Sequence, residues 1–189
     1  MVSAPMAESV AAKRSDAWIW AVVIVATGSV LALAIIQGNR RDRDLARRTV
    51  PLLSLPLLDG HKNSSIEPGR VTVVDFWATW CQPCRASMPR VQRLWQEYQA
   101  RGLDIYSVDT DDESPDRTAQ VREFLMQYGL TFPVVLDDGR ASDAFQVGSI
   151  PMMVLVDKQG HVTWSHVGML SGPRELELRA AIDRALATN

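Results

Sequence analysis

The 189-residue sequence predicts an α/β fold in which helices flank a mixed β-sheet, preceded by an N-terminal transmembrane helix. Three observations lead to this prediction. Strand-like and helix-like segments alternate from about residue 50 onward, and residues 17–36 contain no charged side chain. In addition, Cys81 and Cys84 stand where a strand-like segment runs into a helix-like one. The part of the chain covering residues 51–189 is long enough to form one domain with its own core.

The uncharged stretch at residues 17–36 has the length of a membrane span. Twenty residues of helix rise about 30 Å, which matches the hydrocarbon layer of a bilayer. Trp18 and Trp20 lie near one end, where indole rings prefer the headgroup region. A cleavable signal peptide with a small-residue site at residues 32–34 is the alternative, although the apolar run is long for one. We therefore expect a tail (residues 1–16), an uncleaved anchor (17–36) and a polar tether (37–50).

Charge is distributed unevenly along the chain. Residues 1–49 carry seven Lys or Arg and four Asp or Glu, whereas residues 50–189 carry thirteen and eighteen. An acidic domain argues against nucleic-acid binding, which requires a positive surface. Two basic residues precede the span and five arginines follow it, so the positive-inside rule alone would place the domain in the cytoplasm.

The elements of the domain follow from periodicity and from turn and capping residues. Strands or hairpins are expected at residues 52–66 (with a turn at Asp59-Gly60), 70–78, 103–110, 132–138 and 150–167 (with a turn at 158–160). Helices are expected at residues 82–100 with Gly102 as stop, at 114–128 with Ser114 as cap and Gly129 as stop, and at 171–186 with Leu176, Ala180, Ile182 and Leu186 packed inward. This order gives a mixed sheet with helices on both faces.

The two cysteines are placed for thiol chemistry. Cys81 is expected at the N-terminus of its helix, where free N–H groups and the helix dipole stabilise a thiolate. Cys84 lies one turn further on the same face, so the pair can close a disulfide without unfolding the helix. Pro83 suits a first-turn position. Trp77 and Trp80 are expected to form an apolar wall beside an exposed thiol.

Other uses of the cysteines are weaker. A structural disulfide would close a very small loop and gain little chain entropy. A zinc site needs about four ligands, and the three histidines are not in paired ligand spacing, so no metal site is predicted. Cu(I) needs only two thiolates, so a copper-handling protein that binds metal without redox turnover stays as the alternative. The position of the C-x-x-C pair at a strand-to-helix junction favours redox chemistry.

Two segments resemble the landmarks of the thioredoxin superfamily. VVDFWATWCQPCRASMP (residues 73–89) is similar to its active-site segment, and GSIPMMVLVDKQGHV (148–162) to its cis-proline loop. Pro89 and Gly168 match that superfamily's helix-kinking proline and the glycine before its last helix. The resemblance implies a cis Ile150–Pro151 bond within contact distance of Cys81. It also implies a set of substrate-binding residues: Trp80, Pro83, Ile150 and Pro151.

Two positions distinguish this chain within the branch that it resembles, the membrane-tethered TlpA/ResA/DsbE oxidoreductases. Many members carry a glutamate three residues after the second cysteine, where this chain has Ser87. Asp75 lies six residues before Cys81, at the place of thioredoxin's buried aspartate. A buried carboxylate there would have a raised pKa and could take the proton from Cys84.

The resemblance, which covers roughly residues 50–187, also implies a function. It suggests a reductant of protein disulfides in the extracytoplasmic assembly of cytochrome c or of a copper centre, with the domain in the periplasm and the anchor in the inner membrane. Partners would be protein thiol or disulfide substrates and a membrane electron donor, with no cofactor beyond the Cys81–Cys84 disulfide. Substrate and redox direction stay open. A peroxidase is disfavoured, because Thr79 lies two residues before Cys81 and not three.

Overall fold

The structure is a computed structural model, and it describes residues 18–30, 49–50, 53–60, 63–66 and 69–188. The chain divides into two units, Met1–Arg41 and Asp42–Asn189. In the first unit, residues 18–30 are helical and exposed. The rest of the expected anchor, the tail and most of the tether lie outside the described residues. No helix within the described ranges is both long and apolar enough to span a membrane.

The second unit is built on a five-stranded sheet in the order β5-β4-β3-β6-β7. The strands are β3 (Val71–Trp77), β4 (Leu103–Asp109), β5 (Val134–Leu136), β6 (Met152–Val156) and β7 (Val162–Val167). β3, β4 and β5 are parallel, whereas β6 runs antiparallel to both β3 and β7. The predicted mixed sheet is therefore confirmed. β3 is central and buried along its whole length, which fits its β-branched and aromatic residues.

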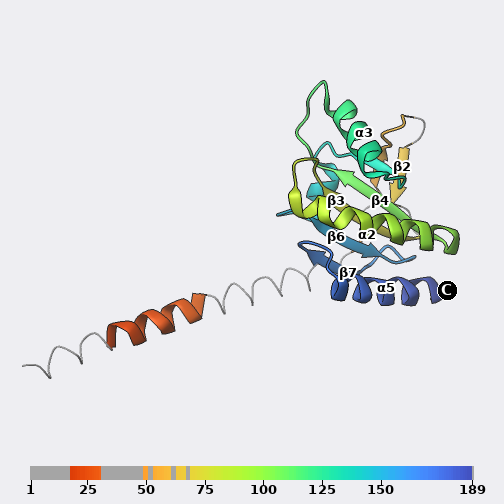
Figure 1. Cartoon of the computed structure of the whole chain (residues 1–189). Helices are drawn as coiled ribbons and strands as arrows, with labels where there is room; N and C mark the ends of the chain where they lie inside the picture. Colours follow the sequence, from red (N-terminus) through yellow and green to blue (C-terminus); the bar gives the residue numbers. More distant parts are fainter. Residues whose placement is uncertain (1–17, 31–48, 51–52, 61–62, 67–68, 189) are drawn as a thin grey trace, which may run out of the picture. The chain divides into compact units, whose positions relative to one another are not determined.

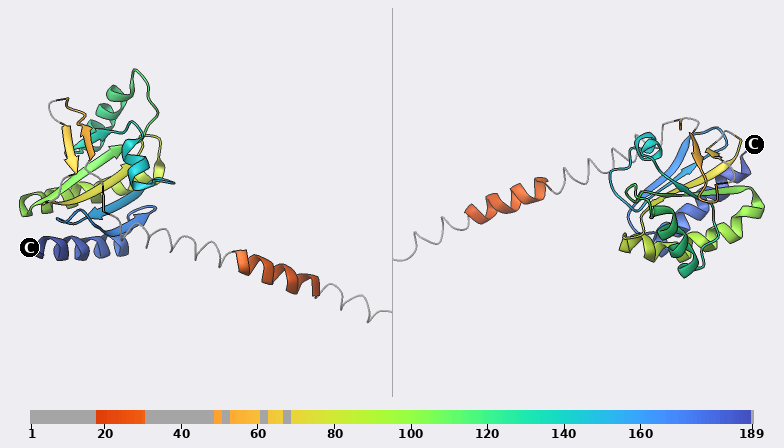
Figure 2. Two further views of the ribbon diagram at one scale, coloured as in Figure 1. Left: turned by 180° about the vertical axis from the view of Figure 1, so that it is seen from behind. Right: turned by 90° about the horizontal axis from the view of Figure 1, so that it is seen from above.

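The two faces of the sheet are covered differently (Figure 1). One face packs against α2 (Gln82–Tyr98), α3 (Arg117–Tyr128) and α5 (Gly172–Ala187) in a core that includes both cysteines. The other face packs against the short helix α4 (Arg140–Phe145) and a hairpin of β1 (Leu53–Pro56) and β2 (Asn63–Ile66). The right-hand view of Figure 2 shows α4 on the opposite side of the sheet from α2. The active-site helix thus lies on the more heavily covered face.

Residues 49–50 and 57–58 make backbone contacts at both edges of the sheet. An isolated bridge pairs Leu57 with Val135 of the edge strand β5, and a second bridge pairs Thr49 with His161, next to the start of β7. These pairs give the terminal strands partners that the five-stranded order alone would not supply.

Glycine stops end the helices at the predicted places. α2 continues into a short 3-10 helix, η1 (Gln99–Arg101), and ends at Gly102 with φ 95°. Gly129 ends α3 with φ 61°. Both values lie in the left-handed region that favours glycine, so these two stops are confirmed.

Three details of the helices differ from the sequence predictions. α3 begins at Arg117 and its cap is Asp116, so Ser114 as cap is wrong. α4 was not predicted at all. α5 does not bury Leu176, which is 70% exposed, or Ala180. Its buried residues are Glu175, Leu178, Ala181, Ile182 and Ala185.

Candidate active site

A disulfide joins Cys81 and Cys84 at the start of α2, with 5.2 Å between their Cα atoms. Cys81 is the N-cap residue, and its Sγ accepts a hydrogen bond from the Cys84 N–H at 3.3 Å. The predicted position of the pair at a helix N-terminus is therefore confirmed. Pro83, between them, is exposed and lies in the first turn. At this place the sulfur of Cys81 occupies the position of a side-chain cap, where negative charge is favoured.

The surroundings of the disulfide differ from the expected apolar wall. Cys81 is only 4% exposed and Cys84 only 1%. Trp77 is fully buried and stacks on Phe124 of α3, with 4.9 Å between ring centroids. Trp80, by contrast, is 67% exposed. The expectation of an apolar wall of both tryptophans beside an exposed thiol is thus wrong, because both sulfurs are buried and Trp77 faces the core, while Trp80 lies at the surface.

Both backbone polar groups of Thr79, two residues before Cys81, form hydrogen bonds with side chains. Its N–H donates to the carboxylate oxygens of Asp111 at 3.1 and 3.2 Å. Its carbonyl oxygen accepts a hydrogen bond of 2.7 Å from Nε of Arg85. Sequence reasoning missed Asp111 and Arg85. The acidic run that follows β4 was a usable signal, since the carboxyl ends of parallel strands meet at one edge of a sheet.

The peptide bond between Ile150 and Pro151 is cis, as predicted. Met152, the next residue, pairs with Phe76 near the end of β3, so Pro151 lies at the end of the sheet from which the cysteine loop departs. Ile150 packs against the core cluster that contains both cysteines. The Pro151 carbonyl oxygen accepts a hydrogen bond of 2.8 Å from the Gly168 N–H.

Asp75 is 2% exposed on β3, and its Oδ2 has no hydrogen-bond partner among the described residues. Strand side chains alternate, so Asp75 shares the α2 face with Val73 and Trp77, the face on which Cys84 is buried. Burial raises the pKa of Asp75 to about 7. Ser107 lies on β4 directly opposite Asp75 and is also buried. Its Oγ likewise has no hydrogen-bond partner within the described part of the chain. The predicted burial and raised pKa of Asp75 are therefore confirmed.

Ser87 occupies the position where many relatives of the resembled branch carry glutamate. It is 3% exposed. Its hydroxyl donates to the Pro83 carbonyl oxygen at 3.1 Å and accepts the Leu170 N–H at 3.0 Å. This side chain is therefore engaged with backbone groups.

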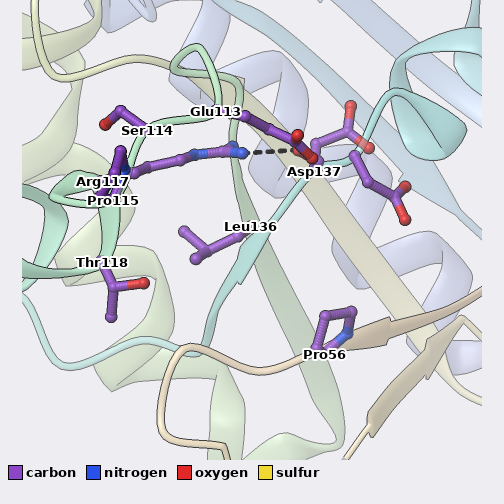
Figure 3. A pocket seen from close by; sticks show the side chains of 9 residues that line it. Pro56, Glu113, Ser114, Pro115, Arg117, Thr118, Leu136 and Asp137 are labelled. Carbon is purple, nitrogen blue, oxygen red and sulfur yellow. Dashed lines mark hydrogen bonds between the residues drawn. The ribbon is translucent and has the colours of Figure 1, made fainter.

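A surface pocket of about 510 Å³ has neither cysteine in its lining. Figure 3 shows its side chains from close by. It is lined by Pro56, Glu113, Ser114, Pro115, Arg117, Thr118, Leu136, Asp137 and Asp138. Arg117 donates to the Asp137 carbonyl oxygen at 2.8 Å, and the Asp137 carboxylate accepts the N–H groups of Ala141 and Ser142 at the start of α4. The polar groups of this pocket thus hold the fold together. In the described ranges, no three His, Cys, Asp or Glu side chains gather as a possible metal site.

Comparisons with known proteins agree with this geometry. The AhpC/TSA family matches residues 47–165. Thiol-disulfide oxidoreductase ResA of Halalkalibacterium halodurans is 29% identical over 161 residues, covering 82% of this chain and 89% of the relative. Thioredoxin-like protein YneN of Bacillus subtilis is 36% identical over 135 residues, covering 70% and 77%.

Solved structures show the same fold. One from Chlorobium tepidum, assigned to thiol:disulfide interchange protein DsbE, has a TM-score of 0.66 and 30% identity, covering 75% of this chain and 98% of that one. The dsbF structure from MTB, in mixed oxidised and reduced forms, has a TM-score of 0.61 and 27% identity, covering 72% and 99%. The chain therefore belongs to the AhpC/TSA family, and it is a thiol-disulfide oxidoreductase of the ResA and DsbE type with a thioredoxin-like fold.

Proposed function

We propose that this protein is an extracytoplasmic reductant of specific protein disulfides, acting through Cys81 and Cys84 during assembly of cytochrome c or of a copper centre. The observation that carries the redox chemistry is the Cys81–Cys84 disulfide at the N-terminus of α2, above a buried carboxyl group on β3. The likeness to the ResA and DsbE type supports the reducing direction.

The proposed reaction begins with the reduced protein. The Cys81 thiolate attacks one sulfur of a substrate disulfide, so that the substrate S–S bond breaks, a mixed disulfide forms and one substrate thiolate leaves. Cys81 suits this step because its sulfur lies at the helix N-terminus, where a thiolate is stabilised.

Cys84 completes the reaction. Asp75 accepts the Cys84 proton, and the Cys84 thiolate attacks the Cys81 sulfur. The mixed disulfide breaks, the second substrate thiolate leaves, and the Cys81–Cys84 disulfide forms. Two electrons have then passed to the substrate. A thiol donor in the membrane must reduce the Cys81–Cys84 disulfide again before the next cycle.

Trp80, Pro83, Ile150 and Pro151 are proposed to bind the substrate. Trp80 and Pro83 are exposed beside the disulfide. Ile150 is half-buried against the core that contains the cysteines. The backbone before Pro151 would pair with an extended substrate segment as an added strand.

The anchor is proposed at residues 17–36, with the domain on the periplasmic side of the inner membrane. The arginines after the span oppose this orientation, but long domains cross membranes largely regardless of flanking charge. A membrane-impermeant thiol reagent, added to reduced cells with a permeabilised outer membrane, should label Cys81. Labelling that appears only after lysis of the inner membrane would refute the orientation.

Substrate identity is best tested by trapping. A Cys84→Ser variant should accumulate mixed disulfides through Cys81, because the second attack is lost. The captured partners should be proteins whose cysteines later bind haem or copper, and capture of unrelated oxidised proteins would contradict the proposed specificity. Reduced wild-type protein titrated with Cu(I) against a competing chelator tests the copper-handling alternative. Tight binding of one Cu(I), together with a failure to reduce any disulfide, would favour that alternative.

A further inference from the structure

Ser87 joins the active-site helix to the loop between β7 and α5. It lies one turn after Cys84, and its hydroxyl bridges two backbone groups, the Pro83 carbonyl oxygen at 3.1 Å and the Leu170 N–H at 3.0 Å. A hydroxyl can donate one hydrogen bond and accept others, so both contacts are made at once. Because Ser87 is 3% exposed, water cannot readily replace it as the partner of the Leu170 N–H.

The loop that Ser87 holds is also attached on its other side. The Gly168 N–H donates to the Pro151 carbonyl oxygen at 2.8 Å, and Gly168 has a φ of 112°, which favours glycine. The Leu170 side chain is buried in the core that contains both cysteines. Residues 168–170 are thus fixed between the Pro151 loop and α2.

The end of β7 and the loop after it present apolar side chains at the active-site end of the sheet. Val167 is 46% exposed and Met169 is 48% exposed, while Leu170 next to them is buried. Trp80, before Cys81, is 67% exposed. We refer to Trp80, Val167 and Met169 as the apolar rim. Exposed apolar groups next to a reactive disulfide are suited to the flanking residues of an extended protein substrate.

We infer that Ser87 is a positioning residue for substrate binding, whose hydroxyl fixes the loop that carries Met169 and directly follows Val167. This inference rests on the proposed reduction of protein disulfides. A loop that is ordered before the substrate arrives lowers the entropic cost of binding. At this position the chain therefore supports recognition of the substrate, whereas Asp75 on β3 is the group proposed to accept the proton.

The chain offers a matched control on the same helix. Gln92 of α2 is also buried, and it also binds a loop backbone: its Oε1 accepts the Thr131 N–H at 2.9 Å. Ser87→Ala removes one helix-to-loop hydrogen bond, and Gln92→Ala removes two, because the Gln92 Nε2 also donates to the Thr131 hydroxyl at 2.8 Å. Gln92→Ala should therefore lower the melting temperature at least as much as Ser87→Ala, but only Ser87→Ala touches the loop next to Pro151.

The test compares a protein disulfide with a small one. Reduced wild type, Ser87→Ala and Gln92→Ala are assayed with insulin and with hydroxyethyl disulfide, which is too small to reach the apolar rim. Ser87→Ala should raise the KM for insulin about five- to tenfold, the size expected for one hydrogen bond, with kcat changed by less than about twofold. Its rate with hydroxyethyl disulfide should match the wild type. Amide exchange at Leu170 should quicken in Ser87→Ala, and at Thr131 in Gln92→Ala.

Each other outcome is informative. Equal losses with both disulfides in Ser87→Ala would overturn the inference, because Ser87 would then act on the thiols. An unchanged KM for insulin, or a wild type that reduces hydroxyethyl disulfide but not insulin, would also overturn it. A wild type that reduces neither compound would refute the proposed function itself, and the role of Ser87 in substrate binding with it.

Discussion

Asp75 and Asp109 are buried aspartates on neighbouring central strands, and their environments differ sharply. Asp109, at the end of β4, is fully buried and forms an ion pair with Arg117, whose Nε lies 2.7 Å from its Oδ1. Arg117 also donates to the carbonyl oxygens of Asp109 and Asp137. Asp75, on β3, has no basic side chain in an ion pair with it within the described residues. The Asp109 carboxylate therefore has a cationic partner within the fold, and the Asp75 carboxylate has none among the described residues.

Both groups nevertheless have a pKa raised to about 7. Burial is the main cause in each case. For Asp109, the hydrogen bond from Arg117 lowers the pKa, while the nearby charge of Asp111 raises it. For Asp75, burial acts alone. The comparison shows that a charge on Asp109 is partly compensated by Arg117, whereas a charge on Asp75 is not compensated by the resting structure. That property suits a group that takes up a proton only during a reaction.

Removing the partner of Asp109 should have the largest effect. Arg117→Ala leaves a buried carboxylate without its cation and takes one donor from each of two carbonyl oxygens, of which that of Asp109 keeps the Asp137 N–H. The free energy of unfolding at pH 8 should fall by about 3–5 kcal/mol. The loss should shrink at pH 6, where Asp109 is protonated and needs no cation. Urea unfolding at both pH values tests this.

The exposed Arg122 on the same helix provides the control for that measurement. It donates one hydrogen bond to the Leu58 carbonyl oxygen. Arg122→Ala should cost about 1 kcal/mol or less at either pH. A loss in Arg117→Ala that does not depend on pH would show that the ion pair is not its cause.

Replacing Asp75 by a neutral side chain should raise the free energy of unfolding, whereas Arg117→Ala lowers it. The folded pKa, about 7, lies above the unfolded value of ~3.9, so the folded state holds its proton longer and stability falls as pH rises between the two values. At about 1.4 kcal/mol per unit this amounts to about 4 kcal/mol. The unpaired N–H groups of the Asn side chain reduce this gain by about 1 kcal/mol. Asp75→Asn should therefore stabilise by about 3 kcal/mol at pH 8 and destabilise by about 1 kcal/mol or less near pH 4.

The matched variant on the other strand sharpens this result. Asp109→Asn leaves Arg117 buried without an anionic partner, so it should lower stability at pH 8. Urea unfolding of both variants between pH 4 and pH 8 gives the comparison directly. Stabilisation by both substitutions, or by neither, would remove the distinction between the two aspartates.

The smallest expected effect is kinetic. Asp75→Asn should slow attack by Cys84 on the mixed disulfide by roughly 10- to 100-fold at pH 7, the range of one general base. Attack by Cys81 should be nearly unchanged, because the helix N-terminus sets that thiolate. Raising the pH should restore the rate as Cys84 ionises unaided. Single-turnover reduction of a model disulfide between pH 6 and pH 10 would show this, and equal rates in both proteins would make Asp75 a purely structural residue.

The sequence predicted what local signals control. The strand-to-helix junction at Cys81 and the glycine stops at Gly102 and Gly129 depend on residues next to each other in the chain, and all are confirmed. Asp75 could be predicted to be buried because the residues around it are apolar, and a strand of that kind is covered on both faces of the sheet. Whether it accepts a proton stays a prediction.

Contacts between distant segments could not be predicted in the same way. Asp111 binds the Thr79 N–H across 32 positions, and Ser87 binds the Leu170 N–H across 83. Periodicity carries no information on such pairs. The predicted inward face of α5 was right for Ile182 and Leu186, which pack in or against the core, and wrong for Leu176 and Ala180, which lie four residues apart on an exposed stripe of the helix. α4 has only six residues, too few for a helical period to show.

Thr49 and Val50, at the end of the expected tether, and Leu57 and Leu58, in the expected hairpin, give backbone partners to segments at both edges of the sheet. A chain shortened to begin after Leu58 would expose the backbone of β5 and the turn before β7. Open strand edges are templates for self-association. Aggregation during expression, with the thiol chemistry itself intact, is therefore the fault to expect from such a truncation. For anyone preparing the isolated domain, the safe boundary lies before Thr49.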